Sequence, residues 1–221
     1  MGIGRLLERT LSRNRERRRL QKSGPLGDFW RAGGNALLSQ DLMLGDDDLA
    51  IDAGAYHGDW SEEILVQYGC RVMLIEAVPE FVRLLAQRFR HNKRVQIVEG
   101  AISNREGPIT ITVMEGSSSM FREPASRKSI ETRLIDVKRL METAGTFDVG
   151  CLKLNIEGAE YDVLERLIAT QQVPRIRDLI VQFHKIAPDP VNRRSAIQAE
   201  LGRTHECRFD YPFVWERWTR R

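Results

Sequence analysis

Apolar residues along this chain fall into short, nearly continuous runs that alternate with stretches of helical periodicity. Continuous apolar runs are typical of parallel strands buried on both faces. Five such runs are expected to form one sheet, over residues 49–51, 71–76, 95–100, 147–156 and 179–184. The stretches with helical spacing are expected as helices over residues 61–69, 79–90, 136–144, 159–170 and 191–201. This alternation predicts an α/β fold with a mostly parallel central sheet and helices on both faces.

Alternating apolar and polar positions predict a smaller number of antiparallel strands. Residues 109–114 alternate isoleucine or valine with threonine, and residues 130–134 read as a second short strand. Between them, the polar residues 116–119 and 124–126 form a candidate lid over a substrate, although a surface loop would have the same composition. Residues 207–211 and 213–218 are expected to close the domain as an antiparallel hairpin with an aromatic exterior.

These elements also predict which side chains face inward. Leu74 and Ile75 are expected in the core because they lie in the middle of a buried strand. In the helix over 79–90, the expected inner face is Phe81, Leu84, Leu85 and Phe89.

Composition indicates a single soluble domain. The chain has 221 residues, of which 42% are apolar and 29% charged, enough for a full core. It has neither an apolar run near the roughly 20 residues of a membrane span nor a secretory signal. Its cysteines, Cys70, Cys151 and Cys207, are scattered and odd in number, which favours reduced thiols in a cytoplasmic protein and no zinc site.

Positive charge is concentrated at the N-terminus. Residues 1–22 carry eight arginines and lysines against two glutamates, a net charge of +6, so the rest of the chain carries −3 of the total +3. The body is therefore no general polyanion binder, and sequence-specific nucleic-acid binding is not expected. Residues 1–22 are expected as a basic, helical or frayed tail, with weak contact to a membrane surface, a nucleic acid or a partner as the functional alternative. Residues 23–47 are expected as a linker and a short packing helix, and residues 48–221 as the domain.

A glycine loop follows the first strand, in the sequence A-I-D-A-G-A-Y-H-G-D-W-S. Strand, glycine loop and helix N-terminus in this order form the place where open α/β sheets bind nucleotide-like cofactors. Gly54 and Gly58 are four residues apart, and Tyr56 stands where the dinucleotide fingerprint needs its second glycine. Asp52 and Asp59 would repel a pyrophosphate, whereas they suit the sulfonium and ammonium of S-adenosylmethionine. A tight turn without a ligand would give the same local pattern.

Two later segments fit the same kind of cofactor. Glu76 ends the second strand 24 residues after Asp52, the interval at which an acidic residue binds a ribose diol. After the third strand, Gly100 and the small residues 101–103 would allow an adenine to lie against the backbone.

The segment K-L-N-I-E-G-A-E places polar residues at the end of the fourth buried strand. An extended strand would put Lys153, Asn155 and Glu157 on one face. A lysine and an amide inside an apolar strand are costly unless they are paired, which favours a functional site. His184 ends the fifth strand, so it is expected near Asn155, at the edge where such sheets place their ligands.

With D-A-G-A-Y-H-G-D-W-S, L-I-E-A-V-P-E, E-G-A-I-S-N and K-L-N-I-E-G-A-E in this order, the chain resembles the FkbM family of S-adenosylmethionine-dependent methyltransferases. The resemblance covers residues 49–184 and implies a Rossmann-like class I methyltransferase fold. It implies that the loop holds the methionine end of the cofactor, Glu76 the ribose and Gly100–Ala101 the adenine. The residues expected to contact the cofactor are Asp52, Gly54, Ala55, Tyr56, Gly58, Ser61, Glu76, Ala77, Gly100 and Ala101.

The resemblance implies O-methylation of a sugar, glycan or natural-product hydroxyl. Methyl transfer requires an aligned oxygen nucleophile and a group that takes its proton. His184 or Glu157 is expected as the base, and Lys153 or Asn155 as the residue that orients base or substrate. No metal is expected. Family members usually carry aspartate where this chain has Asn155, which puts a charged role at that position in doubt.

Two alternatives belong to other functional classes. One is a nicotinamide-dependent oxidoreductase on a similar sheet, which the glycine spacing disfavours. The other is a non-catalytic adaptor that keeps the cofactor fold and binds partners through its basic tail, and Asn155 favours it.

Overall fold

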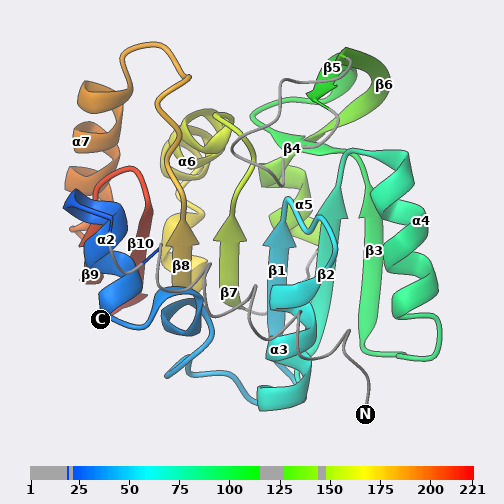
Figure 1. Cartoon of the computed structure of the whole chain (residues 1–221), viewed down its shortest axis with the longest axis horizontal. Helices are drawn as coiled ribbons and strands as arrows, with labels where there is room; N and C mark the ends of the chain where they lie inside the picture. The colour runs from blue at the N-terminus through cyan, green and yellow to red at the C-terminus, as the bar shows by residue number, and fades with distance from the viewer. Residues whose placement is uncertain (1–18, 20–21, 115–126, 144–147) are drawn as a thin grey trace, which may run out of the picture.

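A seven-stranded sheet forms the centre of the fold in the computed structural model, which describes residues 19, 22–114, 127–143 and 148–221 (Figure 1). Its strands are β1 (Leu49–Ala53), β2 (Arg71–Glu76), β3 (Val95–Glu99), β7 (Val149–Leu154), β8 (Ile176–Val181), β9 (His205–Tyr211) and β10 (Trp215–Arg220). They lie in the order β3-β2-β1-β7-β8-β10-β9. The first five are parallel to one another, and β10 is antiparallel to both β8 and β9. The predicted α/β fold with an antiparallel C-terminal edge is confirmed.

The order of the strands places a switch point at the centre of this sheet. From β1 the chain moves outward to β2 and β3, and it later returns to form β7 on the other side of β1. Open α/β sheets bind their ligands at the carboxyl ends of the strands that flank such a point. The loops that follow β1 and β7 are therefore expected to form the ligand site.

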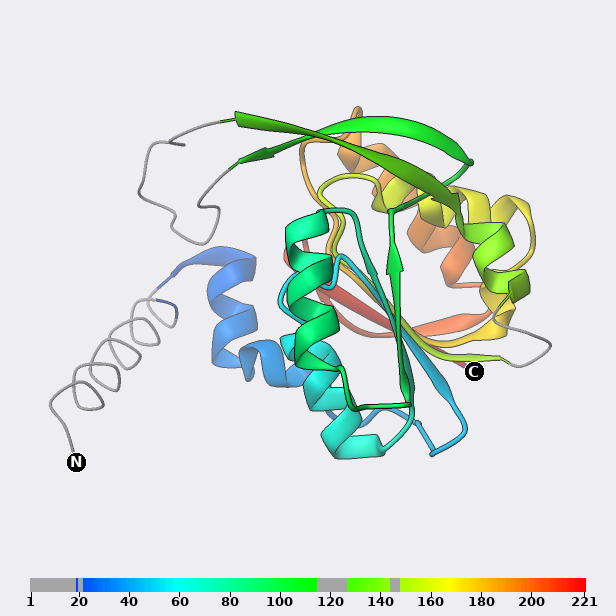
Figure 2. The same cartoon turned by 90° about the vertical axis from the view of Figure 1, so that its right-hand side faces the viewer.

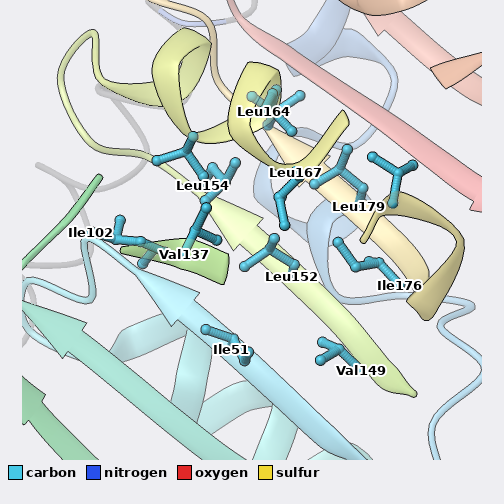
Figure 3. Packing of buried hydrophobic residues seen from close by; sticks show 14 of the residues in the cluster. Ile51, Ile102, Val137, Val149, Leu152, Leu154, Leu164, Leu167, Ile176 and Leu179 are labelled. Atoms are coloured by element: carbon cyan, nitrogen blue, oxygen red, sulfur yellow. The ribbon is translucent and has the colours of Figure 1, made fainter. Parts of the chain in front are cut away.

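Helices cover both faces of the sheet, as Figure 2 shows. One face carries α2 (Gly24–Arg31), η1 (Gly34–Leu38), α3 (Asp59–Tyr68) and α4 (Pro79–Arg88). The other carries α5 (Val137–Thr143), α6 (Glu160–Ala169), η2 (Val173–Arg175) and α7 (Pro190–Leu201). Successive strand residues feed opposite cores: Ala50 and Cys151 pack with the first group of helices, and Ile51 and Leu152 with the second. Figure 3 shows Ile51 and Leu152 in the core beneath Leu164 and Leu167 of α6.

A second sheet lies beyond the carboxyl ends of the main strands. In the described part of the chain it has three strands in the order β4-β6-β5, with β4 at Ala101–Ser103, β5 at Gly107–Met114 and β6 at Arg127–Asp136. The β5–β6 pair is an antiparallel ribbon that Figure 2 shows above the main sheet. Residues 101–103, for which the sequence predicted no element, thus form a strand. The candidate lid, the end of the helix expected over 136–144 and most of the basic tail lie outside the described residues.

Four details differ from the sequence predictions. Helix α2 begins at Gly24, whereas residues 23–27 were expected as a linker and the packing helix was expected to begin at Phe29. Leu84, expected on the inner face of α4, is 50% exposed. The hairpin was expected to have an aromatic exterior, but Trp215 and Trp218 are buried, because they pack into the cores on opposite faces of the sheet. The strand expected to end at His184 ends at Val181.

Leu74 provides a test of the strand assignment, because it is fully buried in the middle of β2, as predicted. Replacing it with alanine removes its contacts and leaves a cavity. Leu74→Ala should therefore lower the free energy of unfolding by about 2–5 kcal/mol, measured by urea denaturation. Leu84→Ala, at an exposed position of α4, is the matched control and should change it by about 0.5 kcal/mol or less. Equal effects of the two substitutions would contradict the assignment.

Candidate active site

The loop between β1 and α3 is held tightly against both neighbouring strands. The amide of Gly54 donates to the carbonyl of Ile75 in β2 at 3.0 Å, and the amide of Asn155, after β7, donates to the carbonyl of Ala53 at 3.1 Å. Gly54 has a φ of +78°, and a Cβ there would lie 2.0 Å from the carbonyl oxygen of Asn155. Only glycine fits this position, since a side chain would push the loops after β1 and β7 apart.

The same loop closes onto α4 at its other end. Gly58 has a φ of +81°, and a Cβ there would lie 2.8 Å from the side chains of both Leu85 and Phe89. Helix α3 starts directly afterwards, and its first turn leaves backbone N–H groups without partners inside the helix. The two predicted glycines therefore have separate structural roles, and between them they aim a helix N-terminus at the loop.

Glu76 anchors the loop from the end of β2. Its carboxylate accepts hydrogen bonds from the amides of Tyr56 and Val78, each at 2.9 Å. Tyr56 has a φ of +52°, which is strained for a residue other than glycine. Its ring stacks on His57 with centroids 3.8 Å apart and meets the edge of Phe81 at 4.5 Å. Each carboxylate oxygen of Glu76 retains a lone pair that could accept a ligand hydroxyl.

Asp52 is buried behind the loop in a paired network. Its Oδ1 lies 2.7 Å from Nζ of Lys153, and its Oδ2 accepts a hydrogen bond from the Ser61 hydroxyl at 2.7 Å. The exposed fractions of the two charged side chains are 1% and 8%. The lysine also lies 5.4 Å and 5.8 Å from the rings of Trp60 and Trp215. Asp52 and Ser61 are thus occupied by contacts within the protein.

This network corrects the expectation that Lys153 shares a face with Asn155 and Glu157. Strand β7 ends at Leu154, and Glu157 has a φ of +52°, so the alternation of an extended strand does not continue to it. The lysine faces Asp52 inside the protein, whereas the side chain of Glu157 is 82% exposed. The cost of burying the lysine is offset by its ion pair and does not by itself indicate contact with a substrate.

His184 lies between two carboxylates after β8. Its Nδ1 is 2.8 Å from Oε1 of Glu160, and its Nε2 is 3.7 Å from Oε2 of Glu157. Glu160 is completely buried, and it also accepts hydrogen bonds from the amides of Ile156 at 2.8 Å and Gly158 at 2.9 Å. The structure therefore brings together two predicted residues, His184 and Glu157, with a third, Glu160, that was not among the predicted site residues.

The pKa of His184 reflects two opposing effects. Burial lowers this pKa, but the hydrogen bond to Glu160 and the charges of Glu160 and Glu157 outweigh burial and raise it above the usual 6.5. The imidazole is thus a proton acceptor whose protonated form is stabilised by its two neighbours. Such a group can accept a proton from a hydroxyl close to neutral pH.

Gly100 and Ala101 mark the passage from β3 to β4. Gly100 donates to the carbonyl of Glu76 at 2.9 Å, and a Cβ on it would lie 2.7 Å from Ile135 of β6. Contact of these two residues, or of Ala55 and Ala77, with an adenine or another part of a cofactor stays a prediction. A cavity of about 660 Å³ opens on the outer side of the loop, between His57, Asp59 and α4, and includes no predicted site residue.

The described residues contain neither a cluster of possible metal ligands nor a helix that could span a membrane. Within residues 19, 22–114, 127–143 and 148–221, no group of three or more histidine, cysteine, aspartate or glutamate side chains could hold a metal ion. Over the same residues, no helix combines the length and apolar character that crossing a bilayer requires.

A mostly parallel sheet, with a glycine loop after its first strand and an acidic residue at the end of its second, defines a class I methyltransferase fold. The chain belongs to the methyltransferase FkbM domain family, whose model matches residues 52–211. This membership confirms the predicted family and its cofactor, S-adenosylmethionine. The oxidoreductase alternative has no support from it.

Solved structures agree with this fold. The methyltransferase FkbM from Methylobacillus flagellatus KT superposes with a TM-score of 0.53 at 12% sequence identity, covering 97% of this chain and 60% of that chain. The chain thus spans about 60% of the length of that protein. A putative rRNA-methylase from Clostridium thermocellum has a TM-score of 0.50 at 9% identity, covering 91% and 100%. No curated protein sequence matches the chain.

The ion pair behind the loop can be tested by stability. Lys153→Met leaves Asp52 buried and unpaired, so it should lower the free energy of unfolding by about 3–5 kcal/mol in urea denaturation. Lys138→Met is the control, because this exposed lysine of α5 pairs with Glu142 at 3.4 Å and its loss should cost about 1 kcal/mol or less. Adding Asp52→Asn to Lys153→Met should recover part of the loss. No recovery would show that the lysine stabilises the fold by packing alone.

Proposed function

We propose that this protein transfers the methyl group of S-adenosylmethionine to a hydroxyl oxygen of a small molecule or glycan, with His184 as the general base. The observation that carries the proposal is the arrangement of the imidazole. Nδ1 is held by buried Glu160, and Nε2 lies beside exposed Glu157, next to the loop after β7. A neutral histidine held in this way has a free acceptor nitrogen at the carboxyl edge of the sheet.

The residues at this edge fit the cofactor. Glu76 would accept the ribose hydroxyls, because its oxygens keep lone pairs beyond the two amides that they already bind. The amides at the start of α3 would receive the carboxylate of the methionine end, with Gly54, Ala55, Tyr56 and Gly58 shaping the loop around it. Ala77, Gly100 and Ala101 would line the adenine. Asp52 and Ser61 would support this loop from inside the protein, since both are buried and paired.

S-adenosylmethionine, when bound, supplies an electrophilic methyl group. The work of the chain is to align the acceptor oxygen and to take its proton. Nε2 of neutral His184 would receive that proton, because Nδ1 faces the carboxylate of Glu160 at 2.8 Å and Nε2 has no partner at that distance among the described residues. Glu157 and Glu160 then stabilise the imidazolium. Lys153 stays with Asp52 inside the fold and acts on this chemistry only through the position of the loop.

The acceptor class rests on the chemistry of the proposed base and on the family resemblance. A hydroxyl is proposed because a histidine base suits an oxygen nucleophile that must lose its proton in the reaction. A sugar, glycan or natural-product hydroxyl follows from the family resemblance. The adaptor alternative keeps one supporting observation, the amide of Asn155 where relatives carry a carboxylate. Binding of S-adenosylhomocysteine with no methyl transfer to a broad panel of sugars and phenols would favour the adaptor.

Glu76 tests the cofactor position. Glu76→Ala removes a charged acceptor of hydrogen bonds, a loss of about 1.5–3 kcal/mol, so binding of S-adenosylhomocysteine should weaken about 10- to 150-fold in calorimetry. Glu99→Ala is the matched control, because Glu99 is paired with Glu76 in register at the end of β3 and is exposed. Its affinity should equal that of the wild type. Equal affinities of all three proteins would contradict the position.

His184 tests the base. On an acceptor found in the panel, His184→Ala should lower kcat by about 10²–10⁴-fold while S-adenosylhomocysteine still binds. The wild-type rate should rise with pH through a pKa above 6.5, because only the neutral imidazole accepts a proton. Glu157→Gln removes a charge that raises this pKa, so the limb should move to lower pH. His91→Ala, in an exposed position after α4, is the control. Unchanged turnover in both His184→Ala and Glu157→Gln would exclude the proposed base.

A further inference from the structure

Glu160 has contacts that the proposed reaction does not by itself require. It opens helix α6, where a glutamate ordinarily reaches into solvent, yet it is completely buried. Its two carboxylate oxygens serve three partners: Oε1 meets both the amide of Ile156 and Nδ1 of His184, and Oε2 accepts from the amide of Gly158. A buried carboxylate is stable only when such donors surround it.

These contacts fix two parts of the site. The amides of Ile156 and Gly158 flank Glu157, whose φ of +52° is strained for a residue other than glycine. The third contact fixes the imidazole on the neighbouring strand end, and the Tyr161 hydroxyl donates to the His184 carbonyl at 3.0 Å. One residue of α6 therefore sets the turn that carries Glu157 and the ring that faces it.

We propose that Glu160 is the positioning residue of this site: it keeps the proton of neutral His184 on Nδ1 and leaves Nε2 free to take the proton of the acceptor. The proposal rests on the proposed function. In the reaction, the O–H bond of the acceptor breaks, its proton moves to Nε2, and the oxygen electron pair forms the new bond to carbon. The Nδ1–H bond to Glu160 remains throughout, so this carboxylate neither gains nor loses a proton.

The two carboxylates around His184 differ in how they act on it. Glu160 is within hydrogen-bond distance of Nδ1, whereas Glu157 is 3.7 Å from Nε2 and largely exposed. The exposed charge of Glu157 changes the pKa of the ring, and it favours a proton on Nε2 less strongly than the shorter, buried contact with Glu160 favours a proton on Nδ1. Replacement of Glu160 should therefore change both the tautomer and the pKa, and replacement of Glu157 the pKa alone.

The test is nitrogen NMR of the histidine rings in the full-length protein, which needs neither acceptor nor turnover. The ring signals of His184 are identified as those that disappear in His184→Ala. At pH values above the pKa of this ring, the wild-type protein should show the Nδ1–H tautomer. In Glu160→Gln, the ring should become a mixture of tautomers with a lower pKa. In Glu157→Gln, the pKa should fall while Nδ1–H is retained. Glu165→Gln is the control, because Glu165 lies on the same helix and pairs with Arg193 at the surface.

Each outcome is decisive. An Nε2–H tautomer in the wild-type protein overturns the proposal, even if Glu160→Gln fails to fold. So does an unchanged tautomer in a folded Glu160→Gln variant. With an acceptor from the panel, Glu160→Gln should also lower kcat at least about 10-fold and leave KM within about threefold. The two proposals can fail separately. If His184→Ala keeps full turnover, the assignment of His184 as the base is wrong. If the wild-type ring is nevertheless the Nδ1–H tautomer and Glu160→Gln loses this tautomer, the positioning role of Glu160 stands.

Discussion

The ion pair between Asp52 and Lys153 is the contact on which the site depends most directly. The two residues are 101 positions apart in the sequence and face each other across β1 and β7, at the switch point of the sheet. Burying two charges is expensive, so such a pair adds little stability over an apolar pair of the same size. What it provides is register, because a shift of either strand would separate Nζ from its carboxylate. The register in turn fixes the two loops that follow.

The loops after β1 and β7 lie close together because the register of the two strands fixes the positions at which both loops begin. Gly54 approaches the carbonyl of Asn155 so closely that no other residue fits, and Glu76 holds the same loop from β2. The carboxylates at the carboxyl edge of the sheet differ in their environments. Asp52 is ion-paired inside the protein, whereas buried Glu76 and exposed Glu157 have no lysine or arginine partner among the described residues, and their negative charge suits a sulfonium cofactor.

The sequence predicted the elements well and the side-chain pairings poorly. Continuous apolar runs identified β1, β2, β3, β7 and β8, and the two glycines identified the tight loop between β1 and α3. The sequence pattern could not predict the ion-pair partner of Lys153, because this partner depends on which strands become neighbours in the sheet. Alternation misplaced Glu157, because the strand ends before it. Trp215 and Trp218 were expected outside because the hairpin was taken as an edge, whereas β10 lies inside the sheet and the two side chains pack into the cores on its opposite faces. Glu160 was missed as a site residue, although a glutamate two residues after a glycine turn was the available signal.

The loops after β1 and β7 are stabilised in the same way. Each contains a residue other than glycine with a left-handed backbone, Tyr56 in the first and Glu157 in the second. Such a conformation costs about 1–3 kcal/mol and persists only where its surroundings enforce it. In each loop a mostly buried glutamate does so by accepting backbone N–H groups, Glu76 at Tyr56 and Glu160 on both sides of Glu157. Each glutamate also faces the chemistry, one toward the proposed ribose position and the other toward His184. The groups that hold the strained turns are thus the same groups that are proposed to orient the ligand and the base, so a change in either would alter the backbone and the proposed chemistry together.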